Sequence, residues 1–146
     1  MISLLDLLPD AGRAGVYHSQ VDATEIVAAA KTAGLLVFTI DLAKVRDKKS
    51  LLDLFAKTLK FPRHFGENWD ALNDCLADLS WLDGKGWVLL LRNADAMSHT
   101  DNQVFQTLLE VLESAAGYWR AQGKPFWAVA KGKADWEPGL AKLAGE

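Results

Sequence analysis

Three short apolar runs, separated by helix-like stretches, limit most strongly how this chain can fold. They cover residues 35–40 (LLVFTI), 87–91 (WVLLL) and 126–130 (FWAVA). Each is too short for a buried helix and is predicted to be a buried core strand. Strands joined by helical connections pair in parallel. The sequence therefore predicts an α/β fold with a small parallel sheet of at least three strands packed with helices, in two or three layers.

The connecting segments carry the three- and four-residue spacing of apolar side chains that is typical of helices. One predicted helix starts at residue 48 and must end before Pro62, a second covers about residues 68–79, and a long third helix lies between the second strand and Gly123. Upstream, residues 15–20 have a strand-like pattern, and a helix is predicted after Asp22 as its N-cap.

These elements divide the chain into three parts that we expect to form one compact unit. Residues 1–34 form an accessory strand and helix, residues 35–131 form the main domain, and residues 132–146 form a polar tail that we expect to be loosely held. No apolar run is long enough to span a bilayer, and the first residues lack the basic start and cleavage site of a secretory signal. The single cysteine, Cys75, cannot form an internal disulfide. We expect a cytoplasmic protein that does not bind membranes.

Motifs for cofactors and metals are missing from the sequence. No GxGxxG follows a predicted strand, and no GxxxxGK[ST] is present. His18, His64 and His99 do not have the spacing of metal ligands. We therefore expect neither a cofactor nor a metal ion.

An acidic stretch contains the most distinctive chemistry of the chain. Between residues 67 and 83 there is no Lys or Arg, and there are five carboxylates, at Glu67, Asp70, Asp74, Asp78 and Asp83. At about 100° per residue, Asp70, Asp74 and Asp78 share one face of the predicted helix, opposite an apolar stripe. Like charges four residues apart cost an isolated helix about 0.2–0.5 kcal/mol each. The row is therefore mildly unfavourable for folding, which points to a function.

Three interpretations of this acidic row are open. It could be a solvated face, although the helix dipole favours only Asp70, in the first turn. It could fill a cationic site built for phosphates, whose Arg and Lys side chains would donate charge-assisted hydrogen bonds to each carboxylate. The carboxylates, with or without His64, could also act as acid and base or bind a divalent ion. The enzymatic interpretation is the weaker one, because carboxylates on an open helix face lack the burial that separates pKa values.

Residues 61–76, FPRHFGENWDALNDCL, resemble the barstar family, whose members carry an aromatic-Gly-Glu-Asn-x-Asp-Ala-Leu-x-Asp-Cys-Leu run. The order of predicted elements from about residue 35 to residue 130 is also similar to the barstar layout, which has a three-stranded parallel sheet with helices. The resemblance implies a barstar-like fold for residues 35–131. It also implies a non-enzymatic inhibitor that blocks the active site of a small basic ribonuclease of barnase type, or a related toxin, without contacting nucleic acid directly.

The resemblance further implies which residues contact the partner. Asp74 matches the family aspartate that enters the phosphate site of the ribonuclease, and Asp70 matches a second acidic contact. The full set implied is His64, Phe65, Gly66, Glu67, Asn68, Asp70, Asn73, Asp74 and Asp78. His64 replaces a family tyrosine and Asn73 replaces an interface tryptophan, which leaves the identity of the ribonuclease open. A binding module for another basic protein or toxin (an immunity protein) and a carboxylate-dependent hydrolase remain as alternatives.

Tryptophan is abundant, with six residues in the chain. Four of them are predicted to face the core: Trp69, Trp87, Trp119 and Trp127. Trp81 and Trp136 are candidates for exposed anchors in an interface. Cys75 falls beside the apolar stripe of its helix and is predicted to be a buried small hydrophobic residue.

Overall fold

The computed structural model describes residues 2–63 and 65–143 and contains a four-stranded, all-parallel sheet. The strands are β1 (Val16–His18), β2 (Leu36–Asp41), β3 (Trp87–Arg92) and β4 (Phe126–Ala130). Their order across the sheet is β1-β4-β3-β2. The three strands predicted from the apolar runs are confirmed, and β1 adds a fourth strand beside β4.

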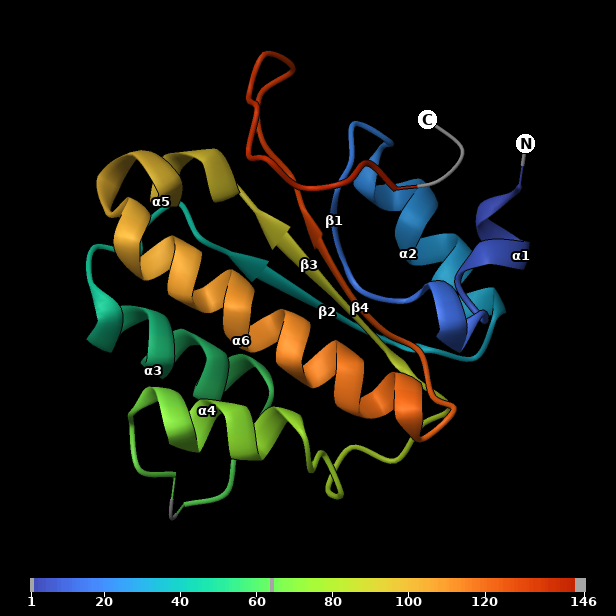
Figure 1. Ribbon diagram of the computed structural model, residues 1–146, viewed down its shortest axis with the longest axis horizontal. Coiled ribbons are helices and arrows are strands. Elements are labelled where there is room, and N and C mark those ends of the chain that lie inside the picture. The colour runs from blue at the N-terminus through green and yellow to red at the C-terminus, as the bar shows by residue number, and fades with distance from the viewer. Residues whose placement is uncertain (1, 64, 144–146) are drawn as a thin grey trace.

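Helices cover both faces of the sheet, so the fold has three layers (Figure 1). They are α1 (Leu4–Leu7), a short 3-10 helix η1 (Ala11–Arg13), α2 (Ala23–Thr32), α3 (Lys48–Thr58), α4 (Trp69–Leu76), α5 (Ala94–Thr100) and α6 (Asn102–Ala121). Buried side chains of α1 and α2 pack on one face, and those of α3 to α6 pack on the other.

The central strand β3 divides its side chains between the two cores. Trp87, Leu89 and Leu91 belong to the cluster with α3 to α6, whereas Val88 and Leu90 belong to the cluster with α1 and α2. This is the two-residue alternation of a strand that is buried on both faces. All five side chains are at most 2% exposed, which explains why the run is apolar without interruption.

The long helix predicted between β3 and Gly123 is α6, and a separate short helix, α5, precedes it. The two helices are divided at Asp101. The side chain of Asp101 accepts a hydrogen bond from the Val104 amide at 3.1 Å and caps α6. Gly123 follows the end of α6 with a φ of +75°, as expected for a residue just past a helix.

The C-terminal tail is not loosely held as far as residue 143, so that expectation is wrong. The amide of His18 donates to the carbonyl of Ala141 at 2.9 Å, and the amide of Leu143 donates to the carbonyl of His18 at 3.0 Å. Leu143 itself is only 1% exposed. Trp136 is half-buried with its ring 6.0 Å from that of Phe105, so it is not an exposed anchor. The tail therefore covers the outer edge of β1.

Candidate protein-binding site

The acidic stretch forms α4, which lies beside α3 and α6 in the helical layer (Figure 1). Asn68 caps the helix, because its side-chain oxygen accepts a hydrogen bond from the Ala71 amide at 2.7 Å. Leu72 and Leu76 are fully buried. Asp70 and Asp74 are exposed on the surface of the helix, as the periodicity predicts.

The C-terminal end of α4 differs from the prediction. The helix ends at Leu76, whose carbonyl accepts a hydrogen bond from the indole Nε1 of Trp119 on α6 at 2.7 Å. Leu79, with a φ of +49°, is in the left-handed region and cannot continue the helix. Asp78 is exposed in the turn beyond the helix, so the prediction that it extends the acidic row along α4 is wrong. The carboxylates on the helix itself are those of Asp70 and Asp74.

The loop before α4 contains the predicted contact residues Phe65, Gly66 and Glu67 and leads to the cap Asn68. Asn73 lies on α4 and is partly buried, and His64 lies outside the described residues. The left-handed residue in this loop is Glu67, with a φ of +51°, and not the neighbouring Gly66. A Cβ atom on Gly66 would lie 3.5 Å from the Asn68 side chain and 3.6 Å from Ala71, which are ordinary contacts. The Asn68 side-chain nitrogen also donates to the Gly66 carbonyl at 3.3 Å. Asn68 thus joins the loop to the helix.

Glu67 lies beside a pair of charged residues on α3. Lys49 donates to Asp53 at 2.8 Å. The hydrogen bond and charge of Asp53, followed by the charge of Glu67, raise the pKa of the Lys49 ammonium above its ordinary value. The spacing of Lys49 and Asp53 predicts their pairing. The sequence contains no signal that Glu67, from a separate loop, would join them.

Aromatic rings support the loop from beneath. The ring of Phe65 lies edge-on to that of Phe61, with 4.9 Å between centroids, and Phe61 contacts Trp81 at 5.9 Å. The indole Nε1 of Trp81 donates to the Leu59 carbonyl at 2.8 Å. Trp81 is therefore half-buried and supports the loop, so it is not an exposed anchor. Trp69, predicted to be core, is also half-buried, and the Lys48 ammonium lies 6.0 Å from its ring centre.

The carboxylates of Asp70 and Asp74 are available to a partner. In residues 2–63 and 65–143, the ion pairs within 4.0 Å are Arg13–Asp10, Lys49–Asp53 and Arg120–Glu113. Neither α4 carboxylate belongs to any of them. Two exposed acceptors one helical turn apart can receive charge-assisted hydrogen bonds from Arg and Lys side chains of another protein.

Cys75 does not add nucleophilic chemistry to this surface. It is only partly buried, not fully buried as predicted. Burial, followed by the charges of Asp78 and Asp74, raises the pKa of the Cys75 thiol. The thiol is therefore protonated at neutral pH and is a poor nucleophile. Across the described residues, no group of three or more His, Cys, Asp or Glu side chains is arranged to hold a metal ion.

Replacing the cap of α4 is expected to lower the stability of the protein. Asn68→Ala removes the hydrogen bonds to Ala71 and Gly66, and we expect the free energy of unfolding to fall by about 1 kcal/mol. Urea unfolding followed by circular dichroism measures this loss. Asn68→Asp is the matched control, because aspartate retains the capping oxygen and should keep most of the stability. Equal stability of Asn68→Ala and the parent would contradict the assigned cap.

Comparison with known proteins gives a match that covers β2, β3, β4 and α4. Residues 35–131 match the family model described as barstar (barnase inhibitor). No curated protein matches the chain. None of the helices in the described residues is long and apolar enough to cross a membrane. The family match spans more than half of the sequence and contains β2, β3, β4 and α4, and the chain therefore belongs to the barstar family.

Proposed function

We propose that this protein is a cytoplasmic, non-enzymatic inhibitor of a small basic ribonuclease of barnase type. The observation that carries the proposal is the pair of exposed carboxylates on α4, Asp70 and Asp74, which have no ion-pair partner in the described residues. Membership of a family described as barnase inhibitors supports the same partner class. The single cysteine is suited to a reducing compartment.

The inhibitor would act by occupying the phosphate site of the ribonuclease. Residues four positions apart on a helix are separated by about 6 Å along its axis. Asp74 would enter the phosphate site, and Asp70 would accept hydrogen bonds from cations at its edge. The remaining contacts would come from His64, Phe65, Gly66, Glu67, Asn68 and Asn73, with Asp78 at the rim. The missing side chain of Gly66 would let the ribonuclease approach the loop backbone closely.

Both ends of α4 are fixed, which is what a rigid inhibitory surface needs. The Asn68 cap holds the first turn of α4. The indole of Trp119 donates to the carbonyl of Leu76 and holds the last turn. A helix that is already ordered loses little conformational entropy when it binds. The carboxylates would therefore meet the cationic site in a fixed arrangement.

Titration against ribonucleases tests this function directly. The full chain is added to small basic ribonucleases of barnase type, and cleavage of a fluorescent RNA substrate is measured. We expect complete inhibition of at least one enzyme at one inhibitor per enzyme. Binding to a basic protein toxin without inhibition of any of these ribonucleases would instead favour an immunity protein for another toxin. Metal-dependent hydrolysis by the purified chain would favour the carboxylate-dependent hydrolase.

The rate of association is expected to depend strongly on salt. Steering between the acidic α4 surface and a cationic active site acts over the Debye length, which falls from about 30 Å at 0.01 M salt to about 10 Å at 0.1 M. We expect the on-rate to fall at least about tenfold over this range, with a much smaller change in the off-rate. Stopped-flow binding measures both rates. An on-rate that salt does not change would exclude the acidic surface as the docking surface.

A further inference from the structure

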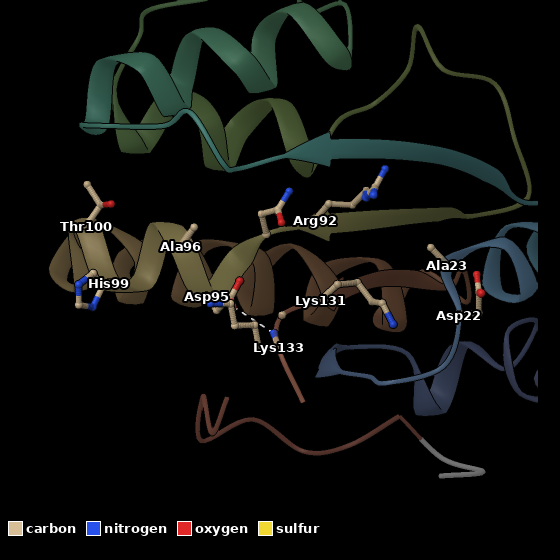
Figure 2. Close-up of a pocket in the computed structure, with 11 residues that line it drawn as sticks. Asp22, Ala23, Arg92, Asp95, Ala96, His99, Thr100, Lys131 and Lys133 are labelled. Carbon is tan, nitrogen blue, oxygen red and sulfur yellow. Dashed lines mark hydrogen bonds between the residues drawn. The ribbon is translucent and has the colours of Figure 1, made fainter. Parts of the chain in front are cut away.

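A cavity of about 920 Å³ lies at the carboxyl edge of the sheet (Figure 2). The elements that line it lie away from α4, as Figure 1 shows. Three segments line it: the start of α2, the segment from the end of β3 through α5, and residues 131–133 just after β4. Its volume is within the range of about 300–1,000 Å³ that is usual for small-molecule sites. The ribonuclease-binding surface proposed above uses none of these segments.

The topology of the sheet creates this cavity. The connection after β1 leads to α2 on one face, whereas the connection after β3 leads to α5 and α6 on the opposite face. β4 lies between β1 and β3, so the two connections leave for opposite faces on either side of its carboxyl end. Ligands of parallel α/β sheets bind outside the carboxyl ends of strands where the connections diverge in this way. β1 and α2 precede residue 35, where the family match begins, so the wall they provide lies outside the matched region.

Positive charge gathers in the cavity from two of the three segments. Arg92, Lys131 and Lys133 all line it (Figure 2). The ammonium of Lys131 donates to the carbonyls of Ser19, at 2.9 Å, and Val21, which fixes its charge at the end of β1. Arg92 is exposed and belongs to none of the ion pairs in the described residues. Its guanidinium can therefore donate to a ligand.

Two carboxylates line the same cavity, but both already accept hydrogen bonds from the chain. Asp22 caps α2 and accepts from the Thr24 amide at 2.9 Å and from the Thr24 hydroxyl at 2.8 Å. Asp95 accepts from the Lys133 amide at 3.1 Å, as the dashed line in Figure 2 shows. Three cationic side chains, those of Arg92, Lys131 and Lys133, stand against two carboxylates in the lining of the cavity.

We propose that this cavity binds a small sugar phosphate. Arg92 and Lys133 would bind the phosphate, since guanidinium and ammonium groups donate the charge-assisted hydrogen bonds that phosphate oxygens accept. Thr100 and the side-chain oxygen of Asn93, which also line the cavity, would hydrogen-bond the hydroxyl groups. The side-chain nitrogen of Asn93 already donates to Asp41 at 2.7 Å. The apolar side chains in the lining are the small ones of Ala23 and Ala96, which favours a polar ligand body over an apolar one.

Calorimetric titration of the full chain with ribose 5-phosphate, ribose and inorganic phosphate tests the proposal. We expect one ribose 5-phosphate per chain, no saturable binding of ribose, and weaker binding of inorganic phosphate. Arg92→Gln and Lys133→Gln should each weaken ribose 5-phosphate binding about tenfold. Lys57→Gln, which removes an exposed cation of α3 away from the cavity, is the matched control and should have no effect. Thermal midpoints verify that every variant folds.

Three results would overturn the proposal. One is an absence of saturable binding of ribose 5-phosphate. Another is an equal loss of affinity in Lys57→Gln and the two cavity variants, which would indicate unspecific attraction to surface charge. The third is inorganic phosphate binding as tightly as ribose 5-phosphate, which would identify an anion site without sugar recognition. Ribonuclease inhibition depends on α4, so it should persist in all three variants. The test of the sugar phosphate site is therefore independent of the test of ribonuclease inhibition.

Discussion

Asp74→Ala is expected to weaken inhibition of the target ribonuclease by at least about thirtyfold. A carboxylate that enters a site lined by Arg and Lys loses its water, and its removal leaves those cations buried without a partner. Such a loss costs about 2–5 kcal/mol or more, and each 1.4 kcal/mol is about a factor of ten in affinity. Asp74 lies in the last turn of α4, one helical turn from Asp70, and is the carboxylate that we propose enters the active site.

The inhibition constant of each variant, measured beside its thermal midpoint, tests this prediction. Asp78→Ala is the matched control, because Asp78 is exposed in the turn beyond α4 and should change inhibition less than about fivefold. Asp74→Ala should fold as stably as the parent, since it relieves a repulsion on an exposed face. Parent-like inhibition by this variant, or a loss of inhibition that only follows unfolding, would contradict the assignment of Asp74.

Trp119→Ala is expected to lower the free energy of unfolding by about 3–5 kcal/mol, the usual cost of replacing a large buried aromatic residue with alanine. Trp119 is 8% exposed, and its ring centroid lies 4.5 Å from that of Trp87. The change also removes the indole donor to the carbonyl of Leu76, at the end of α4. Chemical denaturation followed by circular dichroism gives the free energy of unfolding.

Trp119→Phe separates the packing of this side chain from its hydrogen bond. Phenylalanine keeps an aromatic ring in the core but leaves the Leu76 carbonyl without its donor, which should cost about 1–3 kcal/mol. Inhibition by the folded fraction should also weaken, because the last turn of α4 is no longer held. A Trp119→Phe variant with the stability and inhibition constant of the parent would show that α4 does not depend on this contact.

The sheet was predictable because its signals are local. The runs that became β2, β3 and β4 are apolar and short, and the helical spacing between them requires parallel pairing. The tail was misjudged because its composition is polar. The edge of β1 offers it backbone partners at His18, and the apolar side chain of Leu143 is buried there. Neither feature can be recognised without knowing which strand lies at the edge.

At the binding site, the start of α4 was predictable and its end was not. Asn68 is a residue type that caps helices, and its position before an amphipathic stretch indicated the helix start. The apolar spacing continues to Leu79, yet the helix ends at Leu76, whose carbonyl is held by an indole from α6. That contact joins residues 43 positions apart in the sequence, beyond the reach of periodicity. The left-handed Glu67 was missed because the neighbouring glycine was the more obvious candidate.

The position of β1 at one edge of the sheet also has a consequence for biosynthesis. Val16 pairs with Ala128, and the residue that closes the edge, Leu143, comes later still. Ribosomes add about 5–20 residues per second, so the amino-terminal strand waits at least about five seconds for its partner to be made. Until then Leu7, Leu8 and Ile26, all buried in the finished molecule, lack the β4 part of their core cluster, Trp127 and Val129. We therefore expect the first part to be translated to be the last to fold.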